Sequence, residues 1–229
     1  MKHLESDLNA IRHNNFILIG NDLREFQEKR YVENAIYYPE FTRIVVITYA
    51  TLYNENSQMK RFFKKIVNEN EFTVIATFID VLHQLSGEAI KSNPQYFPIL
   101  CGHNIINYDI PLLIKRFLLY KDKFENNKQL PLILKKSLAS KPWESTIIDT
   151  INVWKFNGYN NEYLSTLMLI TDYLKLKKTT DLDTMIDVSK QYWKHINDNK
   201  SKDALDYISL QSATQTNLVI QLINELRQL

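Results

Sequence analysis

The stretch CGHNIINYDIPLLIKRF at residues 101–117 decides the fold class. The apolar run FPILC at 97–101 leads into this stretch and predicts a short buried strand. The residues beyond the polar GHN predict a helix over 108–120, in whose first turn Pro111 is tolerated. A strand that continues through a loop into a helix is the building unit of an α/β protein.

Asp109 lies where this strand and loop give way to the helix. Open α/β sheets bind ligands at the carboxyl ends of their strands, so Asp109 is the first candidate for a functional carboxylate. Asn104 and Tyr108 are close enough in sequence to orient it by hydrogen bonding. The alternative is a local role, in which Asp109 caps the helix and Asn104 is a turn residue.

The other segments predict strands and helices along the whole chain. TRIVVITYATLY at 42–53 is rich in β-branched and aromatic residues and is the clearest strand, and the polar turn at 54–57 precedes a second hairpin arm at 58–65. Two more strands are expected at 16–20 and 146–150. Helices are expected at 1–12, 22–36, 70–90, 162–175, 182–195 and 202–228. This order predicts a mixed sheet with helices on both faces.

The composition is that of one soluble globular domain. Of 229 residues, 45% are hydrophobic and 24% charged, and we expect a single domain over 1–229 with an N-terminal extension at 1–15. No apolar run approaches the roughly 18–20 residues of a membrane span, so no membrane partner is expected. The single cysteine, Cys101, indicates a reducing, cytoplasmic setting. The sequence contains neither GxGxxG nor GxxxxGKS/T, which excludes the usual dinucleotide and P-loop sites.

The segment 101–117 resembles the second exonuclease motif of the DEDD superfamily, through GHN, the Tyr108–Asp109 pair and the IPLL and KR that follow. More narrowly, the chain is similar to predicted 3′–5′ exonucleases related to the exonuclease domain of family B DNA polymerases. The resemblance covers about residues 16–226. Its other matching stretches, in the same order, are IYYPEFTRIVVITY (36–49), KPWESTIIDTINVWKF (141–156) and SKQYWK (189–194).

This resemblance implies a ribonuclease H-like mixed sheet of the 3′–5′ exonuclease type and a two-metal nuclease. In such enzymes four acids bind two Mg²⁺ or Mn²⁺ ions, which activate water and stabilise the leaving oxygen. The acids belong to an Asp-x-Glu at the end of the first strand, to the second motif, here Asp109, and to a Tyr-x-x-x-Asp on the last helix. Beside this site, we expect Asn104, Tyr108, Lys115 and Arg116 to contact nucleic acid.

The chain departs from this pattern in the first and third motifs. Tyr207 matches the tyrosine of the third motif, but Gln211 stands where the Asp is expected, and an amide brings no negative charge to a metal ion. In the first motif, FILIG places Gly20 at the Asp position and Asp22 at the Glu position. A rival alignment uses the swapped acid pair of ESD at 5–7.

Two of the four acids, Asp22 and Asp109, therefore remain. They imply at most one weakly bound Mg²⁺ or Mn²⁺, because two carboxylates cannot neutralise two divalent ions in a site of lowered dielectric constant. Asp149 in IIDT also resembles a family position, with a structural acid at a strand end as the alternative. His103 is either an acid–base group or a structural residue of the second motif.

Small basic groups accompany plentiful aromatic residues, a combination typical of proteins that bind single strands. The alternative is that each group is a solvated face, because 26 acids nearly balance 28 bases. The groups are Lys60-Arg61 with Lys64-Lys65, Lys115-Arg116, Lys135-Lys136, and Lys175 with Lys177-Lys178.

Three functions fit these residues. The first is an exonuclease-fold protein that has lost catalysis, needs no cofactor, and binds single-stranded nucleic acid or a protein partner in DNA replication or repair. The second is an active exonuclease that trims single-stranded DNA 3′ ends with Mg²⁺ or Mn²⁺. The third is a purely structural subunit of a larger complex. Gly20 and Gln211 favour the first function, and Asp109 with Tyr207 favours the second.

Overall fold

The structure is a computed structural model that describes residues 42–55, 58–92, 98–124, 129–139, 146–155 and 166–227. The chain divides into two units, Met1–Thr42 and Arg43–Leu229, and the features below belong to the second. The strand expected at 16–20 and the helices expected at 1–12 and 22–36 lie outside the described residues. The single domain over 1–229 stays a prediction.

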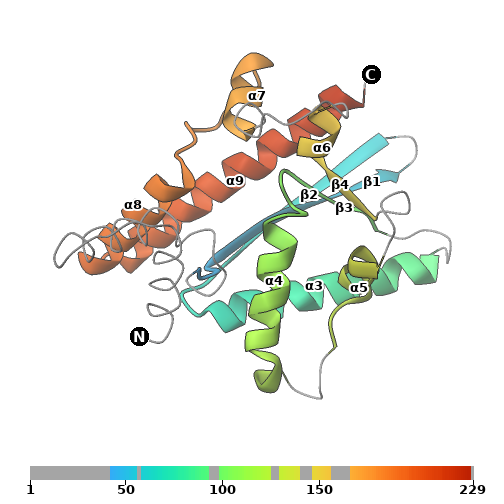
Figure 1. Cartoon of the computed structure of the whole chain (residues 1–229), viewed down its shortest axis with the longest axis horizontal. Coiled ribbons are helices and arrows are strands. Elements are labelled where there is room, and N and C mark those ends of the chain that lie inside the picture. Colours follow the sequence, from blue (N-terminus) through green and yellow to red (C-terminus); the bar gives the residue numbers. More distant parts are fainter. Residues whose placement is uncertain are drawn as a thin grey trace, which may run out of the picture. The chain divides into compact units, whose positions relative to one another are not determined.

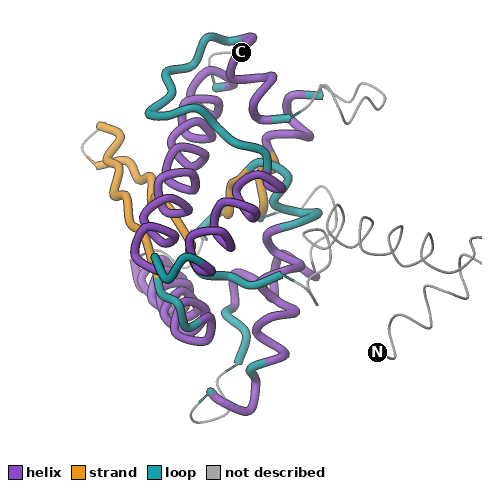
Figure 2. Tube along the Cα trace, turned by 90° about the vertical axis from the view of Figure 1, so that its left-hand side faces the viewer, coloured by secondary structure: helices purple, strands orange, loops and turns teal. Residues whose placement is uncertain are grey.

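A long antiparallel hairpin opens the second unit. Strand β1 (Val46–Glu55) pairs with β2 (Gln58–Val67) in a register that runs from Val46 opposite Val67 to Glu55 opposite Gln58. The two arms expected from β-branched and aromatic residues are confirmed, although the first begins at Val46 and not at residue 42. Figure 2 shows these two strands, in orange, at the margin of the helices.

The hairpin has two different faces, because successive side chains of a strand point to opposite sides. One face, here called the α9 face, is covered by helix α9 (Ser201–Leu226). Ser212 Oγ donates a hydrogen bond to Thr48 Oγ1 at 2.8 Å, and Arg61 Nη1 donates one to Asn217 Oδ1 at 3.5 Å. In Figure 1, α9 is the red helix beside the hairpin. The opposite face contacts helix α3 (Glu71–Ser92) at the end of the hairpin away from its turn, where the rings of Tyr49 and Phe78 lie 5.6 Å apart.

The main core lies among α3, α4 (Asp109–Leu119) and α5 (Leu132–Ala139). Asn70 Oδ1 accepts the Thr73 N–H at 3.3 Å and so helps to start α3. Helix α4 begins at the expected place, and a short 3₁₀ turn, η2 (Lys121–Lys123), follows it. Helix α5 was not expected from the sequence. The buried residues of this core are Ile75, Ile79, Leu82, Ile110, Leu113, Phe117, Phe124, Ile133 and Leu134.

A short parallel sheet joins two distant segments. Strand β3 (Leu100–Gly102) pairs with β4 (Ile147–Asp149), and α6 (Thr150–Trp154) begins directly after β4. Both strands occur where strands were expected, whereas α6 was not expected. Helices α7 (Leu167–Tyr173) and α8 (Met185–Asn197) precede α9. A second, smaller core joins Val45 to Tyr192 of α8 and Ala204 of α9.

The fold is therefore of mixed α/β class, as expected. The described strands form two separate two-stranded sheets, one antiparallel and one parallel, where the sequence predicted one mixed sheet. Strand β1 pairs with β2 and strand β3 pairs with β4, and among the described residues no hydrogen-bonded ladder joins one pair to the other. None of the helices in the described segments combines the length and the apolar character needed to cross a membrane.

Candidate functional site

Asp149 organises the carboxyl ends of β3 and β4. Its carboxylate accepts the N–H groups of Asn104 at 2.8 Å, Ile106 at 3.1 Å and Ile151 at 3.1 Å, and the residue is only 2% exposed. Three backbone donors satisfy a buried carboxylate without a cation. Asp149 thus fixes the loop after β3 and starts α6, which is the role of a structural acid at a strand end.

The loop after β3 is held by further local hydrogen bonds. Asn104 has a φ of 62°, a left-handed conformation that Asn tolerates, and its Oδ1 accepts from Asn107 Nδ2 at 3.1 Å. The hydroxyl of Thr150 donates to the Gly102 carbonyl at 3.2 Å, so His103 Nδ1 is the donor in its 2.9 Å contact with that hydroxyl. This geometry favours the structural interpretation of His103.

Asp109 is the first residue of α4 and retains solvent-exposed surface. The dense protein around its carboxyl raises its pKa to about 6, the negative charge of Asp149 adds to this effect, and the Asp109 N–H opposes it. The N-cap position belongs to Tyr108, whose side chain makes no capping hydrogen bond. Asp109 is therefore a carboxyl that changes charge in a mildly acidic range, beside a second carboxylate at the strand ends.

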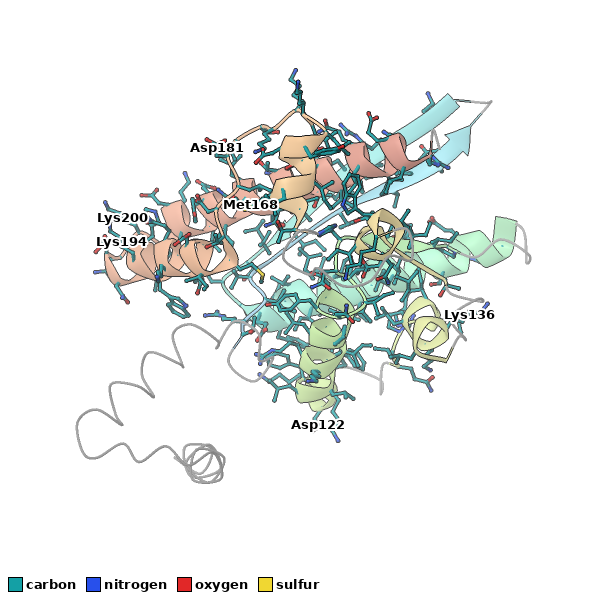
Figure 3. The ribbon with its side chains drawn as sticks, turned by 45° about the horizontal axis from the view of Figure 1, so that its top comes forward. Asp122, Lys136, Met168, Asp181, Lys194 and Lys200 are labelled. Atoms are coloured by element: carbon teal, nitrogen blue, oxygen red, sulfur yellow. The ribbon has the colours of Figure 1, made fainter. Side chains whose placement is uncertain are left out.

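Tyr207 and Gln211, the expected third-motif residues, bind a segment ahead of α8. The Tyr207 hydroxyl donates to Asp183 Oδ2 at 2.5 Å. Gln211 Nε2 donates to the Asp181 carbonyl at 3.2 Å and to Asp183 Oδ2 at 3.3 Å, and Gln211 Oε1 accepts the Asp183 N–H at 3.2 Å. Figure 3 labels Asp181 in this segment. We call Asp183, Tyr207 and Gln211 the Asp183 clasp.

The Asp183 clasp is partly buried, and each of its hydrogen-bond donors faces an acceptor. Gln211 is 5% exposed, so its amide is satisfied by the protein. Burial and the hydrogen bond to Asp183 raise the pKa of the Tyr207 phenol, which therefore stays protonated as the donor. Asp183 was not among the predicted site residues because it was expected inside a helix. Thr184 followed by Asp187 is the signal that was missed, because Thr184 Oγ1 accepts the Asp187 N–H and places Asp183 outside α8.

The expected metal-binding residues divide into those that the structure describes and those that it does not. Gly20 and Asp22 lie outside the described residues. Among the residues with described positions, no three His, Cys, Asp or Glu side chains are grouped to hold a metal ion. Asp149 is engaged by three N–H groups and Gln211 is neutral, so within the described part of this set Asp109 is the carboxylate that is left to contribute.

The expected nucleic-acid contacts of α4 have different surroundings. Lys115 is exposed. The Arg116 guanidinium pairs with both carboxylate oxygens of Glu71, with Nε at 2.8 Å from Oε1 and Nη2 also bonded to Oε2. Glu71 further accepts the Ile44 N–H at 2.8 Å and the Tyr120 hydroxyl at 2.9 Å. Arg116 therefore stabilises the contact between α3 and α4, which disfavours its expected role in nucleic-acid contact.

The most cationic of the expected basic groups is on β2. Lys60, Arg61, Lys64 and Lys65 are exposed within one strand, and Phe62 between them is 52% exposed. Arg61 and Lys65 lie on one face of this strand, and Lys60 and Lys64 lie on the other face together with the Phe62 ring. This combination suits the phosphates and bases of a flexible strand.

Comparisons of the chain with protein-family models, with curated proteins and with solved structures find no match. A function for this chain therefore has to follow from the geometry of its own residues.

Proposed function

We propose that this chain is a nucleic-acid-binding protein with a ribonuclease H-like fold of the 3′–5′ exonuclease type, in which the exonuclease centre has lost catalysis. The hydrogen bonds of Gln211 carry this proposal. At the position where the third motif has a metal-binding Asp, a neutral amide is buried and makes three hydrogen bonds with the segment 181–183. A side chain committed in this way stabilises the fold and brings no charge to a metal ion.

The cations of β2 support nucleic acid as the ligand. Four exposed positive side chains in six residues, Lys60 to Lys65, create a local positive field although the whole chain has a net charge of only +2. Binding to phosphates releases condensed counterions, so such a surface gives an affinity that decreases steeply with salt. A protein partner from a replication or repair complex is the alternative ligand in this proposal.

The second candidate function is an active exonuclease on single-stranded DNA ends. Asp109 favours it, because a carboxyl with a pKa near 6 lies beside Asp149 at the carboxyl ends of two parallel strands. In that case Asp22 and Asp109 would hold one Mg²⁺ or Mn²⁺, which would supply the charge that activates water. The Tyr207 hydroxyl would then have to leave its hydrogen bond to Asp183 and bond to that water instead.

A nuclease assay with a binding measurement on the same samples tests the proposal. The full chain is incubated with a 5′-fluorescein-labelled oligothymidylate in excess Mn²⁺, beside the variant Asp109→Asn. We expect retention of the strand in a fluorescence-anisotropy assay and no shortening of it on a denaturing gel.

Each outcome points to a different function. Shortening from the 3′ end that Asp109→Asn abolishes would establish the active exonuclease. Shortening that Asp109→Asn leaves unchanged would indicate a contaminating nuclease, and repurification then decides. Absence of both binding and cleavage would contradict the proposed function and favour a structural subunit.

A further inference from the structure

The hairpin face opposite to α9, here called the outer face, carries two solvent-exposed aromatic rings. Phe62 is 52% exposed and Tyr53 is 51% exposed. The register places Thr51 opposite Phe62 and Tyr53 opposite Lys60, so the two rings are diagonal neighbours on one face. Diagonal neighbours on adjacent strands lie about 7–8 Å apart. Two rings at this distance are close enough to contact bases of one short strand.

Lysines flank both rings on the outer face. Lys60 is directly opposite Tyr53, and Lys64 is two residues from Phe62 on the same side. The Lys64 Nζ lies 4.9 Å from the centre of the Phe62 ring, which confirms that these side chains share a face. Positive charge and aromatic surface are thus interleaved over the middle of the outer face.

The two faces of the hairpin differ in what already contacts them. On the α9 face, Thr48 and Arg61 are hydrogen-bonded to side chains of α9. On the outer face, the base is covered where Tyr49 contacts Phe78 of α3, while Tyr53 and Phe62 beyond it keep half of their surface exposed. Large exposed aromatic side chains beside lysines are expected where a ligand with both apolar and anionic parts binds.

We propose that the outer face is a binding site for single-stranded nucleic acid, an inference that rests on the proposed nucleic-acid binding of the chain. Phe62 and Tyr53 stack on two bases, and Lys60 and Lys64 contact the neighbouring phosphates. Single strands are favoured over duplexes because stacking on protein rings requires unpaired base faces, which a duplex keeps stacked on each other. Charge complementarity alone would accept either form, so the rings determine the preference.

The test uses matched variants of the full chain. Phe62→Leu removes the ring and keeps an apolar side chain, and Phe62→Tyr keeps a ring. Lys60→Gln with Lys64→Gln removes two charges. The control is Trp193→Leu with Lys194→Gln on α8, an exposed aromatic–lysine pair remote in sequence, with Lys194 labelled in Figure 3. Circular dichroism melting verifies that each variant is folded.

Binding of a fluorescein-labelled oligothymidylate is measured by anisotropy over a salt series, beside a duplex of the same length. We expect Phe62→Leu to weaken single-strand binding about tenfold with an unchanged salt slope, and Phe62→Tyr to restore it. The double variant Lys60→Gln with Lys64→Gln should have a slope of log K against log salt that is smaller by about 1.4, or about 0.7 per lost phosphate contact. The α8 control should bind like the unmodified protein.

The possible failures are distinguishable. If the unmodified chain binds neither form of nucleic acid, the proposed function falls together with this site. If it binds and the outer-face variants equal the α8 control, nucleic-acid binding stands and the outer face is not the site. If a duplex binds more tightly than the single strand and Phe62→Leu has no effect, the stacking role is wrong.

Discussion

The hydroxyl of Tyr207 on α9 donates a hydrogen bond of 2.5 Å to Asp183 Oδ2, which lies 24 residues earlier in the chain. The proton of Tyr207 is therefore held by an acid of its own fold. Gln211, one helical turn further along α9, donates to the same Asp183 oxygen at 3.3 Å. Two side chains that the sequence associates with a metal site thus fasten the segment before α8.

Tyr207→Phe tests the contribution of this hydrogen bond to stability. Removal of the hydroxyl leaves Asp183 Oδ2 with one donor fewer, and a hydrogen bond to a charged group contributes about 1.5–3 kcal/mol. We expect a loss of that size in the free energy of unfolding, measured by urea denaturation. Tyr173→Phe on α7, where the residue is 78% exposed, is the control and should stay within about 0.5 kcal/mol of the unmodified chain. Equal effects for both variants would contradict the role of Tyr207.

Gln211→Glu replaces a buried amide by an acid of the same length. The new carboxylate faces Asp183 Oδ2 and the Asp181 carbonyl, so it loses two hydrogen bonds and adds a like charge. We expect a loss of about 2–4 kcal/mol at neutral pH.

This loss should depend on pH. Burial and the like charge raise the pKa of the introduced acid in the folded state above its unfolded value, so the part of the destabilisation that comes from the new charge is present at neutral pH and disappears as the pH falls below about 4. Gln191→Glu, an exposed position on α8, is the control and should show no such recovery. Gln211→Glu with unchanged stability at pH 7 would contradict the clasp.

Asp109→Asn tests the raised pKa of Asp109 in metal-free buffer. The pKa rises from its ordinary value of 3.8 to about 6 in the fold, so the folded state holds the proton more tightly than the unfolded state. Ionisation of Asp109 therefore decreases stability progressively between pH 4 and 6, and the decrease is complete above about pH 6. The variant lacks this decrease.

Urea denaturation from pH 4 to pH 7.5 measures the effect. The variant should match the unmodified chain at the acidic end and exceed its stability above pH 6. Asp122→Asn in the exposed turn η2 is the control, and Figure 3 labels this residue. A variant that is less stable at every pH would show that Asp109 has a favourable structural contact.

A double-mutant cycle on Glu71 and Arg116 tests the internal ion pair. Arg116→Ala leaves a buried Glu71 carboxylate without its cation, which costs about 3–5 kcal/mol. Addition of Glu71→Gln removes the uncompensated charge, so the double variant should be less destabilised than the sum of the single variants. Lys115→Ala, exposed on the same helix, should change stability by less than about 0.5 kcal/mol. Additive effects would mean that the pair is not coupled.

Local sequence patterns predicted most elements of the described fold, and long-range contacts determined their limits. The first arm of the hairpin begins at Val46 and not at residue 42 because the Ile44 N–H is bonded to Glu71, far along the chain. Helix α6 begins because Asp149 accepts the Ile151 N–H, a cap that follows the IIDT strand. Pro131, directly before α5, was the available signal for that helix.

For the expected site residues, the sequence predicted positions along the fold but not the contacts of their side chains. The position of Asp109 at a helix start after a strand was visible in the sequence and is confirmed. The engagement of Asp149 by the Asn104 and Ile106 N–H groups depends on the closeness of segments 45 residues apart, which no local pattern reveals. The same holds for Arg116, whose adjacent Lys115 indicated a basic surface while its guanidinium binds Glu71.

The two sheets of the described fold differ in how far apart in the chain their partners lie, and this has a consequence for the order of folding. Strands β1 and β2 are neighbours along the chain, so their ladder forms with little loss of chain entropy. Residues 100–102 must meet residues 147–149 across α4, η2 and α5 before three residue pairs form. The hairpin should therefore form early and the parallel pair late, so that Asp149 closes the strand-end loop near the end of folding.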